Sequence, residues 1–494
     1  MKGVPSWLGA RARISAAHPA LEIAGATISY AELHERARAA AEQLCALGVA
    51  PGGVVATLLE NRAPFIELLH AAALCGAALL PLNVRLTPRE LASQLSDADA
   101  RLLLHAAGPL ADRAHTAAAG VPGVQTRQIA GAGHAFAGDR ATPASCRPAG
   151  ADAPCAILFT SGTSGTPKGA LLTHANFTWS AMASAVHLGV DPRDRWLAWM
   201  PLFHVGGLAI LLRSVLYGNT VVVHERFDPA AVNRAFDRDG ITCTSLVATM
   251  LARILEDRGN RPAPPQLRCV LLGGGPAPES TLERARELGF PIAPTYGLTE
   301  AASQVATRAP GDPVLPPGAG LRPLLGTEVR VVGGDGRDVA EGAAGELLVR
   351  GPTVMRGYVH RPAETAAALR DGWLHTGDVA VRASDGSLGI LERRSDLIIS
   401  GGENVYPSEV EAVLLEHPAV AEAAVAAVSD DDFGQRLKGF VVLNSGAAAD
   451  EAALKAYVKD NLARYKVPRE IVFLDELPRN PTGKVLKRLL NERG

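Results

Sequence analysis

Short apolar runs alternate with longer amphipathic stretches along this chain. Uninterrupted apolar runs that are bounded by turn residues are typical of strands buried on both faces of a parallel sheet. We predict such strands at residues 54–59, 156–159, 221–223 and 270–272. Residues 27–30 predict a further strand, followed by a helix that ends at Gly48, because glycine suits a helix C-terminus. This alternation predicts an α/β fold with mainly parallel sheets.

Three stretches depart from the alternation. Residues 71–80 form an unbroken apolar run that is too short to span a bilayer, and we predict a buried helix there. Residues 106–154 are rich in Ala, Gly and Pro and predict irregular surface structure, although they could hide a short strand and helix. Residues 328–351 alternate apolar and polar positions around Gly333–Gly336, which predicts a small antiparallel hairpin.

The length of 494 residues exceeds one ordinary core, so we expect two or more domains. A charged cluster at residues 392–396 separates two apolar runs and predicts a boundary with a hinge near Ser395. Ser408 and Glu411 have the spacing of a capping box at a helix start. We therefore expect a large N-terminal domain, residues 1–392, of mainly parallel sheets with helices plus the small antiparallel unit. A small, mobile α+β C-terminal domain, residues 393–494, follows it.

Composition narrows the class of protein. The formal net charge of −2 gives no indication of a nucleic-acid surface. Six scattered cysteines without a Cys-x-x-Cys pair fit reduced thiols better than a disulfide framework or a zinc site. The first residues lack the apolar core of a signal peptide, and no run is long enough for a membrane span. We expect a cytoplasmic protein.

The densest chemical signal is the run Thr160–Gly169, directly after the predicted strand at 156–159. Glycines let backbone N–H groups approach an anion, hydroxyls add donors, and a lysine adds positive charge. The run differs from a Walker A loop, because Pro167 precedes the lysine and Gly169 follows it. We predict a phosphate-binding loop, and a flexible surface loop is the alternative. Its predicted binding residues are Thr160, Ser161, Gly162, Thr163, Ser164, Gly165 and Lys168.

Five segments, in order, resemble the signature motifs of the adenylate-forming enzymes, which include acyl- and aryl-CoA synthetases, luciferases and peptide-synthetase adenylation domains. They are Thr160–Gly169, Tyr296–Glu300, Thr376–Asp378, Arg393 with Ser400–Asn404, and Gly483–Lys484. The resemblance implies an enzyme that uses ATP and Mg²⁺ to convert a carboxylic acid into an acyl adenylate. CoA, as co-substrate, then takes the acyl group. Such chemistry depends on neutralising and positioning phosphate charge.

By the same resemblance, each motif has a role at the nucleotide. Thr299 contacts the α-phosphate and Glu300 helps to hold Mg²⁺. Tyr296 stacks on adenine, and Asp378 and Arg393 bind the ribose. Gly273, Gly274 and Gly275 line the adenine and acyl pockets. Each residue also has an ordinary alternative. Glu300 would be a solvated carboxylate and Tyr296 a half-buried tyrosine, whereas Asp378 would begin a turn and Arg393 would form a surface ion pair.

The resemblance also implies roles for residues near the acyl and thiol groups. His204 lies at the acyl pocket and thiol tunnel, although a lone histidine is more often structural. Lys484 swings into the site with the small domain and stabilises charge in the adenylating step. Gly401 and Gly402 pass close to the pantetheine arm of CoA. Lys484 also resembles a lysine that is acetylated in several CoA synthetases, so we expect a lysine acetyltransferase and deacetylase as possible partners, and a homodimer is possible.

Within the superfamily, residues 199–208, 273–278 and 299–304 resemble the o-succinylbenzoate-CoA synthetases of menaquinone biosynthesis. The expected reaction is therefore ligation of 2-succinylbenzoate to CoA, with Arg213 and Ser303 as partners of its remote carboxylate. The alternatives are a general fatty-acyl or aryl-CoA ligase, a carrier-protein-loading adenylating enzyme, and a non-catalytic binder of acyl adenylates. No carrier domain follows Gly494, which favours CoA as the acceptor.

Overall fold

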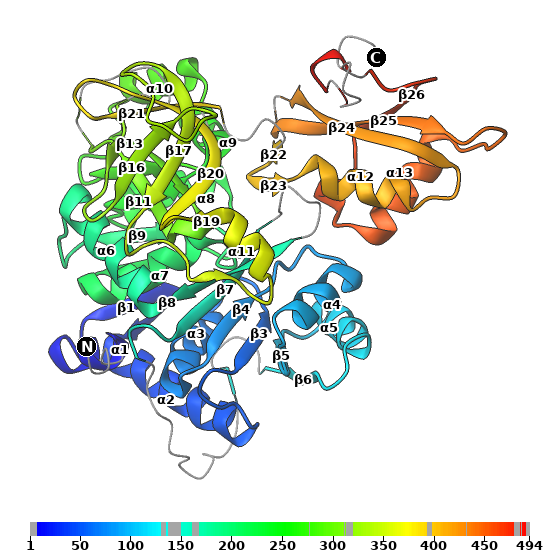
Figure 1. Cartoon of the computed structure of the whole chain (residues 1–494). Helices are drawn as coiled ribbons and strands as arrows, with labels where there is room; N and C mark the ends of the chain where they lie inside the picture. The colour runs from blue at the N-terminus through cyan, green and yellow to red at the C-terminus, as the bar shows by residue number, and fades with distance from the viewer. Residues whose placement is uncertain are drawn as a thin grey trace. The chain divides into compact units, whose positions relative to one another are not determined.

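The structure, a computed structural model, divides into two compact units. Residues 1–84, 95–158 and 169–392 form the first unit, and residues 85–94, 159–168 and 393–494 form the second. Figure 1 colours the chain from its N-terminus to its C-terminus. The structure describes residues 7–129, 135–136, 150–160, 167–275, 277–310, 312, 320–392, 398–430, 432–478, 485 and 487–490. Ser395 lies outside these residues, so the hinge stays a prediction.

The larger sheet of the first unit has the strand order β15-β14-β13-β12-β11-β9-β10-β1-β2. The strands from β13 to β1 pair in parallel, and β2, β14 and β15 add antiparallel edges. The strands are β1 (Pro19–Ile23), β2 (Ala26–Ser29), β9 (Arg195–Ala198), β10 (Thr220–Val223), β11 (Cys243–Leu246), β12 (Cys269–Leu272), β13 (Ile292–Leu298), β14 (Ser303–Thr307) and β15 (Arg322–Pro323). The strands predicted at 221–223 and 270–272 are confirmed.

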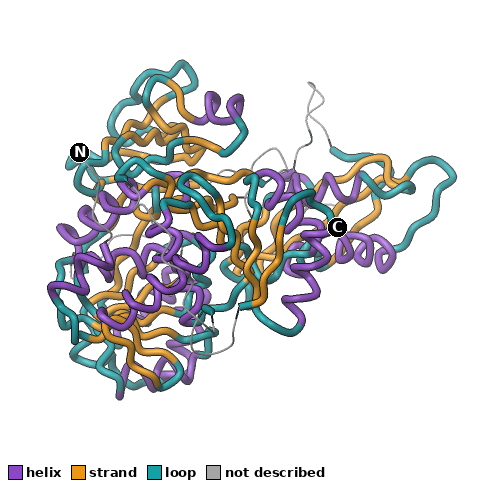
Figure 2. The backbone as a smooth tube through the Cα atoms, turned by 90° about the horizontal axis from the view of Figure 1, so that it is seen from below, coloured by secondary structure: helices purple, strands orange, loops and turns teal. Residues whose placement is uncertain are grey.

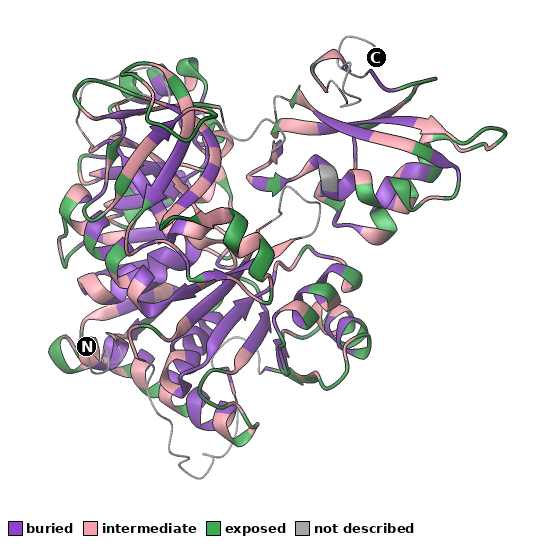
Figure 3. Cartoon of the chain, viewed as in Figure 1, coloured by how far each residue is buried: buried purple, intermediate pink, exposed green. Residues whose placement is uncertain are grey.

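The second sheet has the order β18-β8-β7-β4-β3-β5-β6, with parallel pairing among β7, β4, β3, β5 and β6. Its central strands are buried along their length, as Figure 3 shows in purple. The strands are β3 (Val54–Leu58), β4 (Ala78–Pro81), β5 (Leu102–His105), β6 (Gln125–Gln128), β7 (Pro154–Thr160), β8 (Lys168–Thr173) and β18 (Gly357–Tyr358).

Helices flank the strands of the first unit (Figure 2). They are α1 (Trp7–Ile14), α2 (Tyr30–Ala46), α3 (Ala63–Cys75), α4 (Pro88–Asp97), α5 (Pro109–Ala119), α6 (His174–Leu188), α7 (Val205–Tyr217), α8 (Pro229–Arg238), α9 (Ala248–Arg258), α10 (Glu279–Glu287) and α11 (Pro362–Ala368); the first residues of α4 belong to the second unit. The helix predicted to end at Gly48 is α2, whose N-cap Ser29 accepts a hydrogen bond from the Glu32 N–H.

Two predictions about local structure need correction or completion. Residues 71–80 are not one helix, because α3 ends at Cys75 and β4 begins at Ala78. Gly76 adopts the left-handed conformation, with φ of 69°, and so terminates the helix. The low-periodicity stretch at 106–154 does contain a helix, α5, and a short strand, β6.

A separate antiparallel sheet completes the first unit. Its order is β16-β17-β20-β19, and β21 pairs with β20. The strands are β16 (Glu328–Val332), β17 (Ala344–Arg350), β19 (Leu369–Arg370), β20 (Trp373–Arg382) and β21 (Leu388–Glu392). Since β16 and β17 pair in antiparallel register from Glu328–Arg350 to Val332–Glu346, the predicted hairpin is confirmed.

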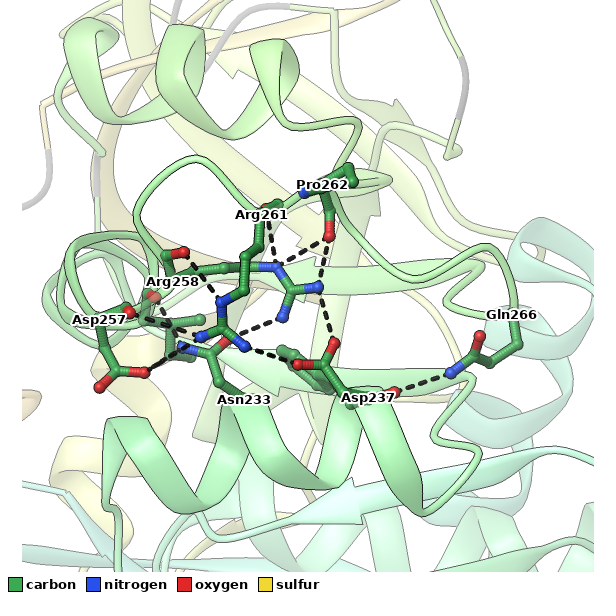
Figure 4. A network of polar contacts seen from close by, with 9 residues as sticks. Asn233, Asp237, Asp257, Arg258, Arg261, Pro262 and Gln266 are labelled. Carbon is green, nitrogen blue, oxygen red and sulfur yellow. Dashed lines mark hydrogen bonds and ion pairs between the residues drawn. The ribbon is translucent and has the colours of Figure 1, made fainter.

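The guanidinium of Arg258, at the end of α9, is buried within the first unit (Figure 4). Its Nε donates to the carbonyl oxygens of Arg261 and Pro262 at 3.0 Å each. Its two Nη groups reach Asn233 Oδ1 at 3.1 Å and Asp237 Oδ1 at 2.9 Å on α8. One cation therefore joins two helices and closes the loop after α9.

The second unit contains a small sheet with the order β23-β22-β25-β24, on which β26 pairs in parallel with β25. Its elements are β22 (Ile398–Ser400), β23 (Glu403–Val405), α12 (Pro407–Leu415), β24 (Val420–Asp430), β25 (Gly434–Leu443), α13 (Glu451–Asn461) and β26 (Glu470–Phe473). The mixed α/β architecture with a smaller α+β C-terminal part agrees with the prediction.

The predicted capping box at Ser408 is wrong. Helix α12 begins at Pro407 with Tyr406 as N-cap, and no side chain caps it. Proline is favoured at this first helical position because its missing N–H would have no partner there. The Glu411 carboxylate instead accepts a hydrogen bond from the Val425 N–H of β24 at 2.8 Å, so it ties the helix to the sheet.

A buried charge cluster lies within the second unit. Lys466 Nζ lies 2.7 Å from Glu90 Oε1 and 2.6 Å from Glu409 Oε1. Burial raises the pKa of Glu409, although the neighbouring Lys466 opposes that shift. The ammonium therefore holds residues of the 85–94 segment and of α12 together. Among the helices of the described part of the chain, none is both long and apolar enough to cross a bilayer.

Candidate active site

The Tyr296–Glu300 motif lies at the end of β13, where the parallel sheet ends. The strand passes into a turn of 3₁₀-helix at Thr299–Ala301, and its register with β14 shifts between Tyr296 and Gly297. A Cβ atom on Gly297 would lie 1.8 Å from the carbonyl oxygen of Ser303, so only glycine fits. The motif's glycine thus allows β14 to approach and places Thr299 and Glu300 at the carboxyl end of the sheet. Ligands of open α/β sheets bind at that end.

Tyr296 and Asp378 form a direct pair. The Tyr296 hydroxyl donates to Asp378 Oδ2 at 2.5 Å, and both residues are buried. Asp378 lies on β20, and its N–H donates to the hydroxyl of Thr376 at 3.1 Å. That hydroxyl donates in turn to the carbonyl oxygen of Leu347 on β17. The Thr376–Asp378 motif therefore fixes its own carboxylate against the antiparallel sheet.

Glu300 is held by a residue that the sequence did not single out. The hydroxyl of Tyr358, on β18, donates to Glu300 Oε1 at 2.9 Å. The Glu300 carbonyl oxygen accepts from the Met355 N–H at 2.7 Å. Strand β18 pairs with β8 through Gly357–Leu171 and Tyr358–Ala170, just after Lys168. The structure thus connects the predicted metal ligand to the strand that leaves the predicted phosphate loop.

Asn176, at the start of α6, supports the same arrangement. Its side-chain amide donates to the carbonyl oxygens of Pro352 at 2.8 Å and Val354 at 2.9 Å. Its Oδ1 accepts from the Thr173 N–H as part of a capping box. Asn176 therefore anchors the loop that carries Met355, and through it the backbone of Glu300. A buried amide with several backbone partners leaves no pattern in the sequence.

The phosphate loop is described only at its ends. Ser161, Gly162, Thr163, Ser164 and Gly165 lie outside the described residues. The hydroxyl of Thr160, the last residue of β7, donates to the carbonyl oxygen of Lys168, the first residue of β8, at 3.4 Å. The segment therefore begins and ends on hydrogen-bonded strands, as expected for a loop that presents backbone donors to an anion.

His204 is the N-cap residue of α7, and it is half-buried. Its N–H donates to the Pro201 carbonyl oxygen at 3.1 Å, and its own carbonyl oxygen accepts from Leu208 N–H at 2.9 Å. The loop that carries it follows β9, so His204 also lies beyond the carboxyl end of a parallel strand. Gly273, Gly274 and Gly275 take the corresponding place after β12.

In the second unit, Gly401 and Gly402 form the turn between β22 and β23, with φ values of 58° and 85°. A Cβ atom on Gly401 would lie 2.8 Å from the Phe433 ring. The turn therefore needs glycine for its own conformation, whatever passes beside it. Arg393 and Lys484 lie outside the described residues, so their roles stay predictions.

Arg213, on α7, is a buried cation. Its guanidinium carbon lies 4.2 Å from the centre of the Trp196 ring, and Nη1 donates to Gln304 Oε1 at 3.3 Å. Burial lowers the pKa of Arg213. Its Nε has no hydrogen-bond partner, and no carboxylate in the described part of the chain forms an ion pair with it. Gln304 is the neighbour of Ser303, which has φ of 97°.

The described residues gather no group of three His, Cys, Asp or Glu side chains that could hold a metal ion. Glu300 is a single oriented carboxylate, and Mg²⁺ is usually bound through one or two carboxylates together with substrate phosphates. The donor set at Glu300 therefore fits a magnesium ion that arrives with a nucleotide.

Comparison with known proteins finds relatives over nearly the whole chain. Residues 9–359 match the family model described as AMP-binding enzyme, and residues 409–484 match that of the AMP-binding enzyme C-terminal domain. The chain is 44% identical to the 2-succinylbenzoate–CoA ligase of Geobacillus kaustophilus (strain HTA426), over 99% of this chain and 98% of that protein.

Solved structures agree. A double mutant of o-succinylbenzoate CoA synthetase from Bacillus subtilis, bound with its product analogue OSB-NCoA, superposes with a TM-score of 0.90 at 39% identity, covering 99% of this chain and 98% of that one. The same enzyme in complex with ATP and magnesium ion gives a TM-score of 0.73 at 39% identity, with 99% of each chain covered.

Proposed function

The chain belongs to the AMP-binding, adenylate-forming enzymes, and from this membership we propose that it is an ATP-dependent 2-succinylbenzoate–CoA ligase. The observation that carries the reaction class is the joining of Tyr296 with Asp378 and of Tyr358 with Glu300 beside the carboxyl end of β13. The full-length likeness to ligases of that specificity supports the choice of acid. ATP, Mg²⁺ and CoA are the required small molecules.

The reaction has two half-reactions. A carboxylate oxygen of the acid attacks the α-phosphorus of ATP, which forms the acyl adenylate and displaces pyrophosphate. The thiol sulfur of CoA then attacks the acyl carbon, loses its proton, and AMP leaves. The first step brings a carboxylate and a phosphate together, and the second develops negative charge on the acyl oxygen and the departing phosphate, so oriented donors and cations supply most of the stabilisation.

Residues of the chain take the following proposed roles. Tyr296 offers an aromatic face to adenine, Asp378 accepts hydrogen bonds from the ribose hydroxyls, and Arg393 also contacts the ribose. Thr299 contacts the α-phosphate, and Glu300, held by Tyr358, positions the magnesium ion. Lys168 and the loop at 160–165 bind the outer phosphates. Lys484 would serve the adenylating half-reaction, and Gly401 and Gly402 the thiol half-reaction after rotation about a hinge near Ser395.

The remote carboxylate of 2-succinylbenzoate needs a cation or donors in an apolar pocket. Arg213 suits this role because it is 4% exposed and has no carboxylate partner among the described residues. A buried charge without a counter-ion is costly, and an anionic ligand would relieve the cost. Ser303 lies beside Gln304, the hydrogen-bond partner of Arg213, and its hydroxyl adds a second donor in this proposal.

The testing experiment is ATP–pyrophosphate exchange and AMP release with a panel of carboxylic acids, with and without CoA. We expect 2-succinylbenzoate to give the highest kcat/KM, and Arg213→Met to raise its KM more than that of a monocarboxylic acid. Preference for octanoate or benzoate would place the chain with general acyl- or aryl-CoA ligases. Acyl transfer to a carrier protein but not to CoA would identify a loading enzyme. If none of the acids supported exchange, the chain would instead be a non-catalytic binder of acyl adenylates.

Three further parts of the proposal concern the cell. We place the enzyme in the cytoplasm, where ATP and CoA are found, and allow for a homodimer, which light scattering would detect. A lysine acetyltransferase and deacetylase would act on Lys484, because acetylation removes the charge that adenylation needs. Mass spectrometry of acetylated protein decides this last point: acetylated Lys484 with full adenylating activity would refute it.

A further inference from the structure

One buried side chain joins the carboxyl-end loops of the two large sheets. Asn61 follows β3 in the seven-stranded sheet, and residues 199–202 follow β9 in the nine-stranded sheet. Asn61 Nδ2 donates to the carbonyl oxygens of Trp199 at 3.2 Å and Met200 at 3.0 Å. Its Oδ1 accepts from the Leu202 N–H at 3.0 Å. Asn61 is 6% exposed, so water does not compete freely for these bonds.

The loop that Asn61 holds leads directly into His204. Trp199 and Leu202 are 2% and 1% exposed and anchor the loop in the core. The His204 N–H donates to the Pro201 carbonyl oxygen, which closes a turn before α7. A Cβ atom on Gly207 would lie 2.4 Å from the Pro201 carbonyl oxygen and 3.0 Å from that of Met200. The start of α7 therefore packs on the same backbone groups that Asn61 holds. A shift of these groups would also displace His204.

We propose that Asn61 is a positioning residue, which fixes the loop at 199–202 and through it His204 at the acyl-binding end of the site. The inference rests on the proposed function, because the family resemblance behind that function implies that His204 lies at the acyl pocket. Only an amide can perform the task. Two carbonyl oxygens require N–H donors, whereas the Leu202 N–H requires an acceptor, and a carboxylate of the same shape offers no donor.

The consequence for catalysis follows from geometry. Without Asn61, two carbonyl groups and one N–H of the loop lose their partner, and the loop must shift to satisfy them. A displacement of about 1 Å in a positioned group can cost about 100-fold in rate. We therefore expect Asn61→Ala to lower kcat/KM for the carboxylic acid about 100-fold. The KM for ATP should change little, since Tyr296 and Asp378 are held by other elements.

The test is a double-mutant cycle of Asn61→Ala and His204→Ala, with kcat/KM for 2-succinylbenzoate and the unfolding free energy as separate readouts. If Asn61 acts through His204, the double variant loses no more kcat/KM than His204→Ala alone. The isosteric Asn61→Asp should be as impaired as Asn61→Ala. The inference would be overturned if the losses of kcat/KM in Asn61→Ala and His204→Ala were additive in the double variant. It would also be overturned if Asn61→Ala raised the KM for ATP as much as the KM for the acid, or if Asn61→Asp had wild-type kinetics.

Asn233→Ala is the matched control. Asn233 is a buried asparagine whose amide donates to the Ile254 carbonyl oxygen at 3.0 Å and Asp257 Oδ2 at 2.8 Å, within the network of Figure 4. This variant should lose stability but keep its kcat/KM at temperatures where it is folded. A wild-type enzyme that activates no carboxylic acid would remove the proposed function itself, whereas an active wild type with a fully active Asn61→Ala removes only this inference.

Discussion

At the scale of single residues, each carboxylate of the candidate site is held by a phenol. Tyr296 donates to Asp378 and Tyr358 donates to Glu300, at 2.5 and 2.9 Å. A phenol restrains a carboxylate without neutralising it, so the negative charge stays available to a ribose hydroxyl or a metal ion. Hydrogen bonds to charged groups are also stronger than those between neutral groups.

Tyr358→Phe tests the importance of this restraint. The variant keeps the ring but removes the donor, so Glu300 should become more mobile and hold magnesium less well. A hydrogen bond to a charged group contributes about 1.5–3 kcal/mol, so we expect a loss of about tenfold or more in adenylation, with a higher magnesium requirement. ATP–pyrophosphate exchange over a magnesium titration measures both. An unchanged magnesium dependence would contradict the role of Tyr358.

Sequence reasoning found some of these residues and missed others for a physical reason. Tyr296, Glu300 and Asp378 were predicted because they lie in short motifs that resemble those of the adenylate-forming enzymes. Tyr358 and Asn61 act across the chain: Tyr358 meets Glu300 because a two-residue strand pairs with β8, and Asn61 meets residues more than a hundred positions away. Such partners follow from tertiary structure, so no local pattern could show them.

At the scale of elements, the Arg258 cluster shows how one side chain can stabilise a helix pair. Arg258 is 3% exposed and bonds to α8 and to the loop after α9. We expect Arg258→Met to lower the free energy of unfolding by about 3 kcal/mol or more, because it leaves Asn233 Oδ1 and the carbonyl oxygens of Arg261 and Pro262 without their donor, and each buried acceptor without a donor costs about 1–3 kcal/mol. Urea unfolding measures the loss.

Arg261→Met is the control for that measurement. Arg261 bonds to Asp237 as well, but its side chain is 51% exposed, and exposed ion pairs contribute less than about 1 kcal/mol. Equal losses in the two variants would show that burial of Arg258 is not the source of the stability.

Elements also show where apolar patterns are ambiguous. Residues 71–80 are apolar throughout, and a buried helix end and a buried strand satisfy that pattern equally. The left-handed Gly76 decides between them, and only the structure shows its conformation. The strand predicted at 54–59 lies between Gly52–Gly53 and Asn61, and the strand predicted at 270–272 is followed by three glycines, so β3 and β12 were found.

At the scale of the whole molecule, the protonation of buried histidines couples stability to pH. Burial lowers the pKa of His70 and of His174 to about 4 each. In the unfolded chain both would be protonated below about pH 6.5, so the unfolded state then binds more protons. The free energy of unfolding should therefore decrease as the pH is lowered from about 6.5 to 4, by about 1.4 kcal/mol per pH unit for each histidine.

Urea unfolding at about pH 7.5 and 5.5 checks this, a range in which exposed carboxylates contribute little. His70→Gln should remove the contribution of one histidine, about 1.4 kcal/mol per pH unit below about pH 6.5. The half-buried His34, His187 and His224 have lowered pKa values as well and act in the same direction. A stability that is constant over this range would contradict the prediction.

The two half-reactions give a further prediction at this scale. Lys484→Ala should reduce acyl-adenylate formation by orders of magnitude, since one charge-stabilising group contributes a few kcal/mol in the transition state. Thioester formation from supplied acyl adenylate and CoA should survive. Single-turnover assays of each half-reaction make the comparison. Equal loss of both would remove the argument for a hinge near Ser395.

The closed loop after α9 has one more consequence, which concerns proteolysis. Residues 259–262 are exposed, and the side chain of Arg261 is half-exposed, so the loop resembles a site for proteolysis. A protease must draw out an extended segment, yet the carbonyl oxygens of Arg261 and Pro262 are both bound to Arg258. The bond after Arg261 also precedes proline. Surface exposure therefore does not make this loop a point of cleavage, and a chain that has lost the Arg258 guanidinium would be nicked in this loop by a protease of broad specificity before it unfolds.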